Sequence, residues 1–187
     1  MKTLLSILII FITLLLSCED HSYENREMEA RQKFDKNTSA KQKQLVNDFF
    51  DGKINYGDHF NGVYGGFYCL WKRRDMDISP HISLNDMFVK EGYKVTTNRD
   101  SLNFIIISER ISHKVGTYTN GGDALKMETI ISVINLKNDT ASVIDKTMGS
   151  DPPSSSFSRV GSGSGSSGSW LSDEDIFDFL KTNIIKQ

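Results

Sequence analysis

Hydrophobic residues are spaced unevenly along the chain, which divides into a first apolar run, a polar stretch and a mixed remainder. The apolar run covers Leu4–Leu16 and follows Lys2. It is too short to cross a bilayer comfortably, because a spanning helix needs roughly 20 apolar residues. A positive residue before a short apolar run is the layout of a secretion signal. Residues 1–17 are therefore predicted to be a signal peptide and not part of the fold.

The polar stretch that follows is densely charged and has few apolar residues. We expect residues 18–44 to form a tether that could become helical, because too little apolar surface is present for a packed core. As a coil of about 26 residues, the tether would reach roughly 30 Å. The folded part is then a single domain over residues 45–187.

The mixed remainder alternates between helical and strand-like spacing. Lys43–Phe50 groups its apolar residues on one side and predicts a helix that ends at Gly52. Phe67–Lys72 predicts a strand with apolar residues on both faces, which is typical of a central strand. Leu102–Ser108 is the most apolar of the predicted strands. Shorter elements are expected at three further places: a helix capped by Ser83 over Ser83–Glu91, and strands over 93–97 and 114–119.

The C-terminal third carries the clearest local signals. Met127–Leu136 and Ala141–Thr147 are rich in β-branched residues and are joined by a short polar connection, which predicts a β-hairpin. Residues 149–169 are rich in glycine and serine and predict an exposed loop. Ser172 should cap a final helix, whose first turn is acidic, as the helix dipole favours. The apolar stripe of that helix consists of Ile176, Phe177, Leu180 and Ile184.

This order of elements contains no repeated βαβ alternation. It predicts the α+β class, with a mainly antiparallel sheet of about five or six strands. The N- and C-terminal helices are expected to pack together on one face of that sheet.

A cysteine stands where the first apolar run meets the polar stretch. Leu15-Leu16-Ser17-Cys18 closes the run and is followed by two acids. This resembles the lipobox of bacterial lipoproteins. The resemblance implies that the Cys18 thiol carries a diacylglycerol, and that the signal is removed before Cys18. Two or three acyl chains anchor a protein firmly, whereas one gives only marginal binding. The alternative is an ordinary signal peptide with a chance cysteine.

The lipobox resemblance also implies a location. The protein would be anchored through lipid in the bacterial cell envelope, in the outer membrane, facing the periplasm or the cell surface. Glu19-Asp20, directly after the cysteine, is similar to the acidic export tag of some outer-membrane lipoproteins.

A second resemblance covers about residues 100–185. The stretches VGTYTNGG, VINLK and GSDPP, followed by the Gly/Ser loop and the acidic helix start, are similar to a small domain of secreted and lipid-anchored bacterial proteins. That domain has no established activity, so the resemblance implies architecture and location only.

Charge excludes one class of partner. The chain has 187 residues, with 22 basic and 24 acidic side chains, and a net charge of −2. Removing residues 1–17 takes away Lys2 and no acid, so the mature chain is more negative. Lys72-Arg73-Arg74 is the densest basic run, but it is too short for the basic patch that nucleic-acid binding requires. We expect no nucleic-acid partner.

Cys69 is the other cysteine. If Cys18 carries lipid, Cys69 has no partner for an intramolecular disulfide. Because it lies in an apolar strand, it should behave as a small buried hydrophobic residue. As a nucleophile it would need a nearby base to lower its pKa, and His59 and His81 are the candidates by distance in sequence.

Two motifs suggest ligands and both fail on context. Asp75, Asp77 and His81 could hold a metal ion, but their spacing matches no EF-hand loop. Residues 163–168 read G-x-G-x-x-G, but they do not follow a strand and they precede an acidic helix start that would repel a pyrophosphate. We expect no metal and no cofactor.

The aromatic residues Tyr64, Tyr68 and Trp71, with His59 and His81, are the candidate binding residues for a sugar or a peptide. Core packing is the alternative explanation for the aromatic side chains. No catalytic constellation is recognised, so the expected function is a non-catalytic binding or structural module with a protein, peptide or glycan partner. The alternatives are a small envelope hydrolase that uses His59 or His81 with an acid or Cys69, and a toxin-neutralising or inhibitor lipoprotein.

Overall fold

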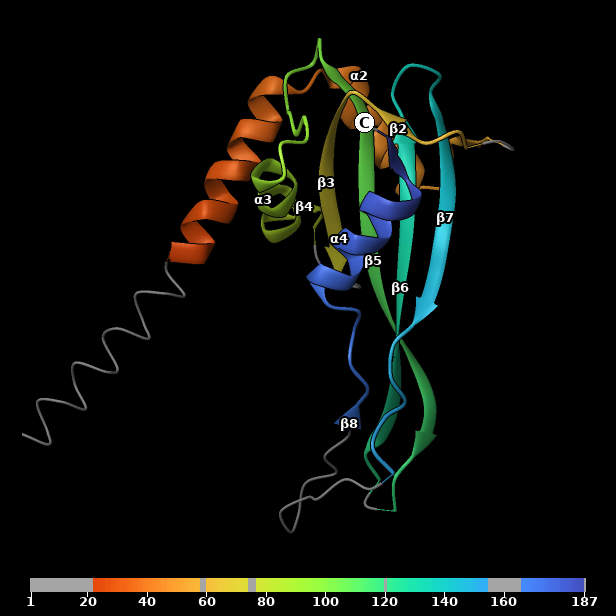
Figure 1. Cartoon of the computed structure of the whole chain (residues 1–187). Helices are drawn as coiled ribbons and strands as arrows, with labels where there is room; N and C mark the ends of the chain where they lie inside the picture. The colour runs from red at the N-terminus through yellow and green to blue at the C-terminus, as the bar shows by residue number, and fades with distance from the viewer. Residues whose placement is uncertain (1–21, 58–59, 74–76, 120, 155–165, 187) are drawn as a thin grey trace, which may run out of the picture.

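The computed structural model describes residues 22–57, 60–73, 77–119, 121–154 and 166–186. These residues form a large mixed sheet with helices on both faces, and a small two-stranded sheet beside it (Figure 1). The helices are an N-terminal helix over residues 22–37, α2 (Ala40–Phe50), α3 (Ile82–Lys90) and α4 (Asp173–Asn183). The strands are β1 (Asn55–Tyr56), β2 (Val63–Tyr64), β3 (Gly66–Arg73), β4 (Ser79–Pro80), β5 (Leu102–Thr117), β6 (Asp123–Asn135), β7 (Thr140–Met148), β8 (Ser166–Ser167) and β9 (Ile185–Lys186).

The large sheet has seven strands in the order β1-β7-β6-β5-β3-β4, with β8 beside β6. Strands β5, β6 and β7 form an antiparallel meander, whereas β3 pairs with β5, and β1 with β7, in parallel. The predicted α+β class is confirmed, and the sheet is mixed and not purely antiparallel, although its longest pairing, β5 with β6, is antiparallel. The chain leaves β3 through β4 and α3 and returns to the starting end of the sheet, and such a crossover makes the next strand parallel.

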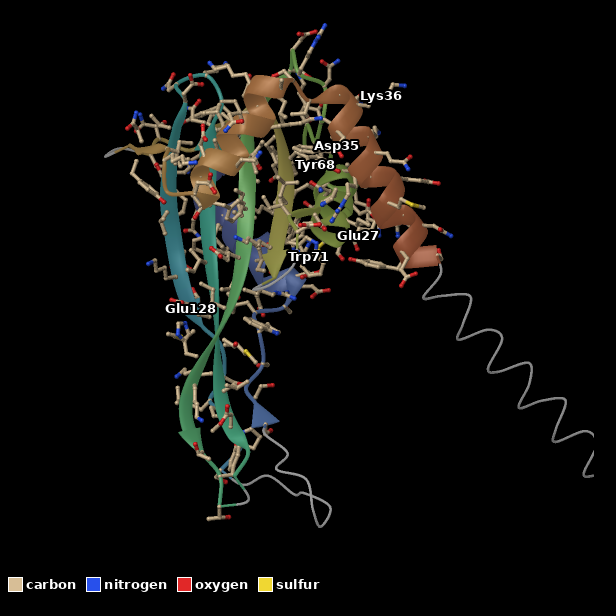
Figure 2. All side chains as sticks on the ribbon, turned by 180° about the vertical axis from the view of Figure 1, so that it is seen from behind. Glu27, Asp35, Lys36, Tyr68, Trp71 and Glu128 are labelled. Atoms are coloured by element: carbon tan, nitrogen blue, oxygen red, sulfur yellow. The ribbon has the colours of Figure 1, made fainter. Side chains whose placement is uncertain are left out.

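The prediction that the terminal helices share one face is wrong. α2 covers one face of the sheet, and α3 and α4 cover the other (Figures 1 and 2). Along β3, Phe67 and Cys69 pack with α3 and α4, while Tyr68 and Leu70 pack with α2. A strand that is apolar on both faces must be covered on both faces, so the alternation in β3 and β5 requires two helical layers.

Strand β5 is longer than expected. The strands predicted at 102–108 and 114–119 are one continuous strand that pairs with β6 over most of its length. Glu109 and Arg110 interrupt the apolar pattern without interrupting the backbone pairing. The far ends of β5 and β6 project beyond the rest of the sheet (Figure 1). The strand predicted at 93–97 is reduced to one bridge, between Val95 and Phe67.

The β6–β7 hairpin is confirmed, with Asn135 opposite Thr140 at its closed end. At the base of the loop that follows, the backbone at residues 149–150 lies close to the backbone at residues 168–169. A Cβ atom added to Gly149 would lie 1.9 Å from the Ser169 carbonyl oxygen, and one added to Gly168 would lie 1.9 Å from the Ser150 carbonyl oxygen. Two backbone segments therefore cross at a distance that only glycine permits. Part of the predicted loop, residues 155–165, lies outside the described residues.

The two predicted helix caps have different outcomes. Ser172 caps α4, and its hydroxyl accepts a hydrogen bond from the Asp175 N–H while the Asp175 carboxylate accepts one from the Ser172 N–H. This capping box satisfies two backbone donors at once. In α3 the N-cap residue is His81 and not Ser83, and the cap makes no side-chain hydrogen bond.

The predicted tether is helical over residues 22–37, and its expected boundary at residue 44 falls inside α2. This N-terminal helix packs against the domain: the Phe34 ring stacks on Tyr68 with centroids 5.5 Å apart, and Arg31 donates to Ser79 Oγ at 2.6 Å. Residues 1–21, which include the predicted signal peptide and Cys18, lie outside the described residues. No helix within the described ranges is long and apolar enough to cross a membrane.

Candidate functional site

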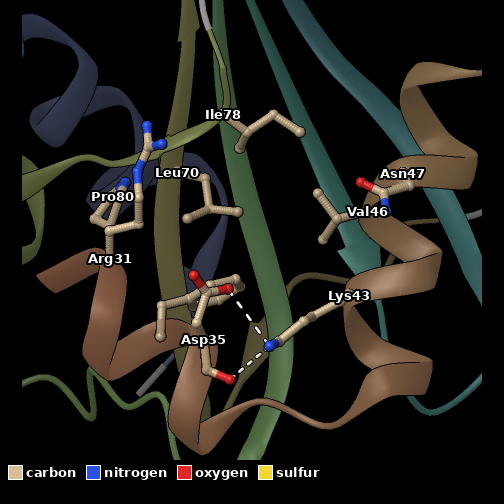
Figure 3. Close-up of a pocket in the computed structure, with 9 residues that line it drawn as sticks. Arg31, Asp35, Lys43, Val46, Asn47, Leu70, Ile78 and Pro80 are labelled. Atoms are coloured by element: carbon tan, nitrogen blue, oxygen red, sulfur yellow. Dashed lines mark hydrogen bonds and ion pairs between the residues drawn. The ribbon is translucent and has the colours of Figure 1, made fainter. Parts of the chain in front are cut away.

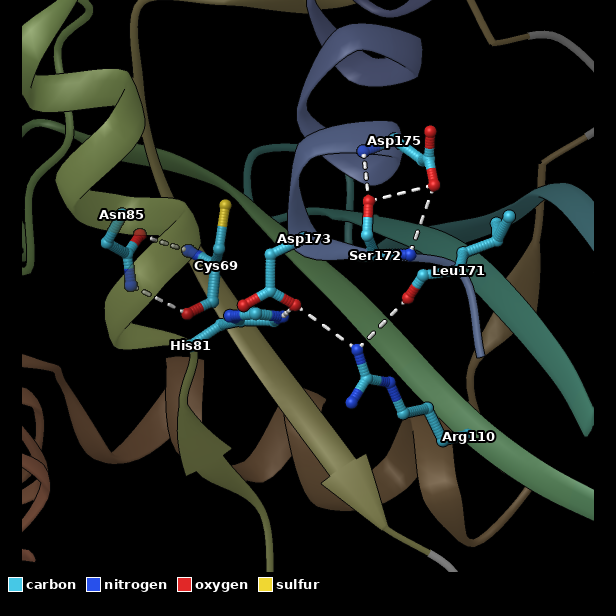
Figure 4. A network of polar contacts seen from close by, with 8 residues as sticks. All are labelled: Cys69, His81, Asn85, Arg110, Leu171, Ser172, Asp173 and Asp175. Carbon is cyan, nitrogen blue, oxygen red and sulfur yellow. Dashed lines mark hydrogen bonds and ion pairs between the residues drawn. The ribbon is translucent and has the colours of Figure 1, made fainter. Parts of the chain in front are cut away.

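A partly buried polar network joins the start of α4 to the sheet (Figure 4). Arg110, on β5, donates from Nη2 to Asp173 Oδ1 at 3.2 Å and to the Leu171 carbonyl oxygen at 3.3 Å. The His81 Nε2 lies 3.6 Å from the same Asp173 oxygen. Asp173 is the first residue of α4, where the helix dipole favours a carboxylate. The network therefore holds the beginning of α4 against β5 and the start of α3.

Two tryptophans contact the cation of this network. The guanidinium of Arg110 lies 5.8 Å from the Trp71 ring centroid and 5.7 Å from that of Trp170. The Trp71 ring also contacts the His81 ring, with centroids 5.5 Å apart. Planar guanidinium groups stack well on aromatic faces. Trp170 therefore docks the end of the Gly/Ser loop onto the sheet.

Cys69 lies beside the network but does not belong to it chemically. Its side chain is fully buried in the core between the sheet, α3 and α4. Burial raises the pKa of the Cys69 thiol, because the thiolate would lose its hydration. Its backbone is fixed by Asn85, which donates to the Cys69 carbonyl and accepts from the Cys69 N–H, both at 2.9 Å. In Figure 4 the Cys69 sulfur points away from the His81 ring.

The network contains a histidine and a carboxylate, which are two of the three members of a catalytic triad. A working triad also needs a nucleophile within hydrogen-bond reach of the histidine and a path to substrate. The His81 side chain is 4% exposed and lies under Trp71, and Cys69 points elsewhere. The arrangement therefore serves to attach α4 to the sheet and does not form a catalytic site.

The candidate binding residues are distributed over several parts of the fold. Tyr64 is half exposed on β2, in the small sheet, while Tyr68 is buried against α2 and the N-terminal helix. Trp71 and His81 meet on the opposite face. His59 lies outside the described residues. The structure thus joins Trp71 with His81, and Tyr64 and Tyr68 do not form an aromatic platform with them.

A shallow hollow of about 240 Å³ lies between the N-terminal helix and α2, above β3 and β4 (Figure 3). Its base is apolar and its rim is charged. One end is closed by Lys43, whose ammonium group lies 3.4 Å from Asp35 Oδ1 and donates to the Asp35 carbonyl oxygen. The lining residues are Arg31, Phe34, Asp35, Lys43, Val46, Asn47, Leu70, Ile78 and Pro80.

Beside the hollow, burial raises the pKa of Tyr68 to about 12, with smaller contributions from Cys69 and Asp86. The phenol therefore stays neutral at physiological pH and acts as an apolar ring under Phe34. Its position explains why an aromatic residue that looked like a binding residue is part of the core.

Asp77 and His81, two of the three side chains that the sequence offered as possible metal ligands, do not lie together in the structure. Asp77 is exposed and lies 3.7 Å from the Arg31 guanidinium, whereas His81 is buried on the other face. Asp75 lies outside the described residues. Within the described ranges, no group of three or more metal-ligating side chains is present.

Sequence reasoning missed Arg110 and Asp173 as partners. The sequence did contain an indication: Arg110 comes two residues after Ser108, the last of five consecutive buried residues in β5, and alternation places it on the same face as Ser108, so its charge needs a partner there. No family model matches the chain, and no curated protein matches it.

Proposed function

We propose that this protein is a lipid-anchored protein of the bacterial cell envelope that acts as a non-catalytic binding or structural module. Support for the anchor comes from the sequence, in which an apolar run ends in Leu15-Leu16-Ser17-Cys18. Support for a non-catalytic role comes from one observation. The candidate nucleophile Cys69 and the candidate base His81 are buried and serve the packing of α3 and α4.

In this proposal the partner-binding surface is the hollow between the N-terminal helix and α2. An apolar base with a charged rim suits an apolar side chain of a protein or peptide partner. A glycan partner is less well supported, because Tyr68 is buried and Tyr64 and Trp71 lie elsewhere.

The anchor is tested by mass spectrometry of the protein purified from its own membranes. We expect a mature chain that begins at Cys18 and carries two or three acyl chains, and a soluble, unmodified chain for Cys18→Ser. A native protein without lipid would refute the proposed location.

The binding role is tested by crosslinking in intact cells. A partner that is crosslinked by the wild-type chain should be lost in Ile78→Asp, which places a charge on the base of the hollow, and kept in Val143→Asp, which changes an exposed residue of β7. Cys69→Ala should keep the partner and the phenotype of the wild type. Loss of a measured turnover in a folded Cys69→Ala protein would favour the hydrolase, and equal loss of partner in both Asp variants would refute the hollow as the site.

A further inference from the structure

The N-terminal helix is attached to the domain along its length. The Arg26 guanidinium forms an ion pair with Asp86 on α3, and Arg31 donates to Ser79 on β4. Further along, Asn37 donates to Thr97 Oγ1 at 3.1 Å. With the Phe34–Tyr68 stack between them, these contacts recur three to five residues apart, so they lie on one side of the helix.

The opposite side of this helix does not suit a membrane surface. A helix that lies flat on a bilayer needs an apolar face and usually a cationic polar face. Residues 22–37 contain four acids and four bases, and their exposed residues form no apolar stripe. The exposed positions include Glu24, Met28, Glu29, Gln32, Lys33 and Lys36. The helix therefore has no physical reason to lie in the headgroup layer.

Chain length limits how far α3 can be from the anchor. Ser22, the first described helical residue, lies four residues along the chain from Cys18, and four residue steps can span at most about 14 Å. Four helical residues more lead to Arg26 and add about 6 Å. Asn37 lies eleven residues further along the helix, which corresponds to about 16 Å. The α3 end of the domain is thus tied close to the anchor, and the loop at 97–100 is tied to the far end.

We infer that the N-terminal helix is a rigid spacer that holds the exposed end of α3, around Val89, next to the lipid surface and keeps the 97–100 loop away from it. This inference rests on the proposed lipidation of Cys18. It replaces the expected flexible tether by a fixed orientation, in which one end of the domain faces the membrane. The partner at this end is a lipid surface.

The test measures energy transfer from a dye on the protein to headgroup dyes in vesicles of phosphatidylethanolamine and phosphatidylglycerol. The full lipidated chain is labelled at Val89→Cys or at Asp100→Cys, both of which are exposed positions. Cys69 is buried and should not react with the label. From the spacing of about 16 Å along the helix, we expect transfer at position 89 to exceed that at position 100 by about twofold or more.

A release variant shows whether docking of the helix causes the difference. Arg26→Ala, Arg31→Ala and Phe34→Ala together should make transfer at the two positions equal, whereas Lys33→Ala on the outer side should preserve the difference. Circular dichroism checks that each variant is folded.

The outcomes separate this inference from the proposed function. Lipidated wild-type protein that binds vesicles with equal transfer at both positions would overturn the inference and leave the anchor intact. A difference that survives in the folded release variant would also overturn it. Lipidated protein that fails to bind vesicles would overturn the proposed anchoring itself.

Discussion

Two buried hydroxyl groups on the α4 face of the sheet lack hydrogen-bond partners among the described residues. Ser108 on β5 and Thr129 on β6 are at most 3% exposed, and neither side-chain oxygen is bonded. A buried polar group without a partner costs free energy, because it gives up its hydrogen bonds to water. Thr129 lies opposite Arg110 on the neighbouring strand, and Ser108 lies two residues before Arg110 on β5. The polar network that attaches α4 to the sheet is therefore next to two buried hydroxyl groups without hydrogen-bond partners among the described residues.

This residue-scale cost can be measured at Thr129. Thr129→Val keeps the shape of the side chain and removes the hydroxyl, so we expect the free energy of unfolding to rise by about 1 kcal/mol. Thr117→Val is the matched control, because Thr117 is an exposed β5 residue whose hydroxyl reaches water. Urea denaturation of the three proteins checks the prediction. A loss of stability in Thr129→Val would mean that the hydroxyl has a partner in solution.

At the residue scale, burial was predictable from the sequence and pairing was not. Cys69 was expected to be a buried hydrophobic residue because its neighbours are apolar, and its burial is confirmed. The Arg110–Asp173 pair joins residues that are far apart in the chain. Their meeting depends on where α4 docks, and a pattern of local spacing does not contain that information.

At the scale of elements, α3 and α4 lie on the same face of the sheet but begin with different N-caps. Substitutions at the two starts should therefore change the free energy of unfolding by different amounts. Ser172 makes a complete capping box for α4, whereas Ser83 lies inside α3 and makes no cap. Ser172→Ala should lower the free energy of unfolding by about 1 kcal/mol. Ser83→Ala should be neutral or slightly stabilising, because alanine is the better helix former.

Thermal and urea denaturation of the two variants provide the measurement. Equal losses in both variants would contradict the assignment of His81 as the N-cap of α3. A neutral Ser172→Ala would mean that the capping box of α4 adds nothing beyond the packing of its apolar stripe.

Elements that depend only on residues close together in the sequence were predicted well. The β6–β7 hairpin and the start and apolar stripe of α4 follow from a turn, a cap and a periodicity within one segment. The length of β5 was missed, because its polar outer half is a strand only through pairing with β6. The parallel pairing of β3 with β5 was missed for a related reason: it depends on the path of the chain through α3.

At the scale of the whole molecule, two core clusters lie on the two faces of one sheet. The cluster on the α3 and α4 face includes Ile176, Leu180 and Ile184 of the C-terminal segment, all at most 1% exposed. The cluster on the α2 face includes Val46 and Phe49. The N-terminal helix contributes no buried residue to either cluster, although Phe34 packs against the second. The N-terminal helix, which lies within the stretch predicted to be a tether, is thus attached to the second cluster through Phe34 without supplying a buried residue to it.

This distribution of core residues predicts that the two ends of the chain contribute very differently to stability. A chain that begins at Thr38 keeps Ser39 as the N-cap of α2 and both clusters, and loses mainly the Phe34–Tyr68 stack and the surface ion pairs. We expect cooperative unfolding with a decrease of about 1–2 kcal/mol, because an aromatic pair adds roughly 0.5–1.5 kcal/mol beyond area burial and exposed ion pairs add little. Urea denaturation followed by circular dichroism measures it.

Removal of the other end should abolish folding. A chain that ends at Ser172 lacks the α4 side chains that fill one cluster, and burial of each large apolar side chain contributes about 1.5–3 kcal/mol. Several such losses exceed the stability of a typical domain, so this chain should show no cooperative transition. If instead the chain from Thr38 failed to fold and the chain to Ser172 folded, the N-terminal helix would be part of the core. It could then not act as a spacer attached to an independently stable domain.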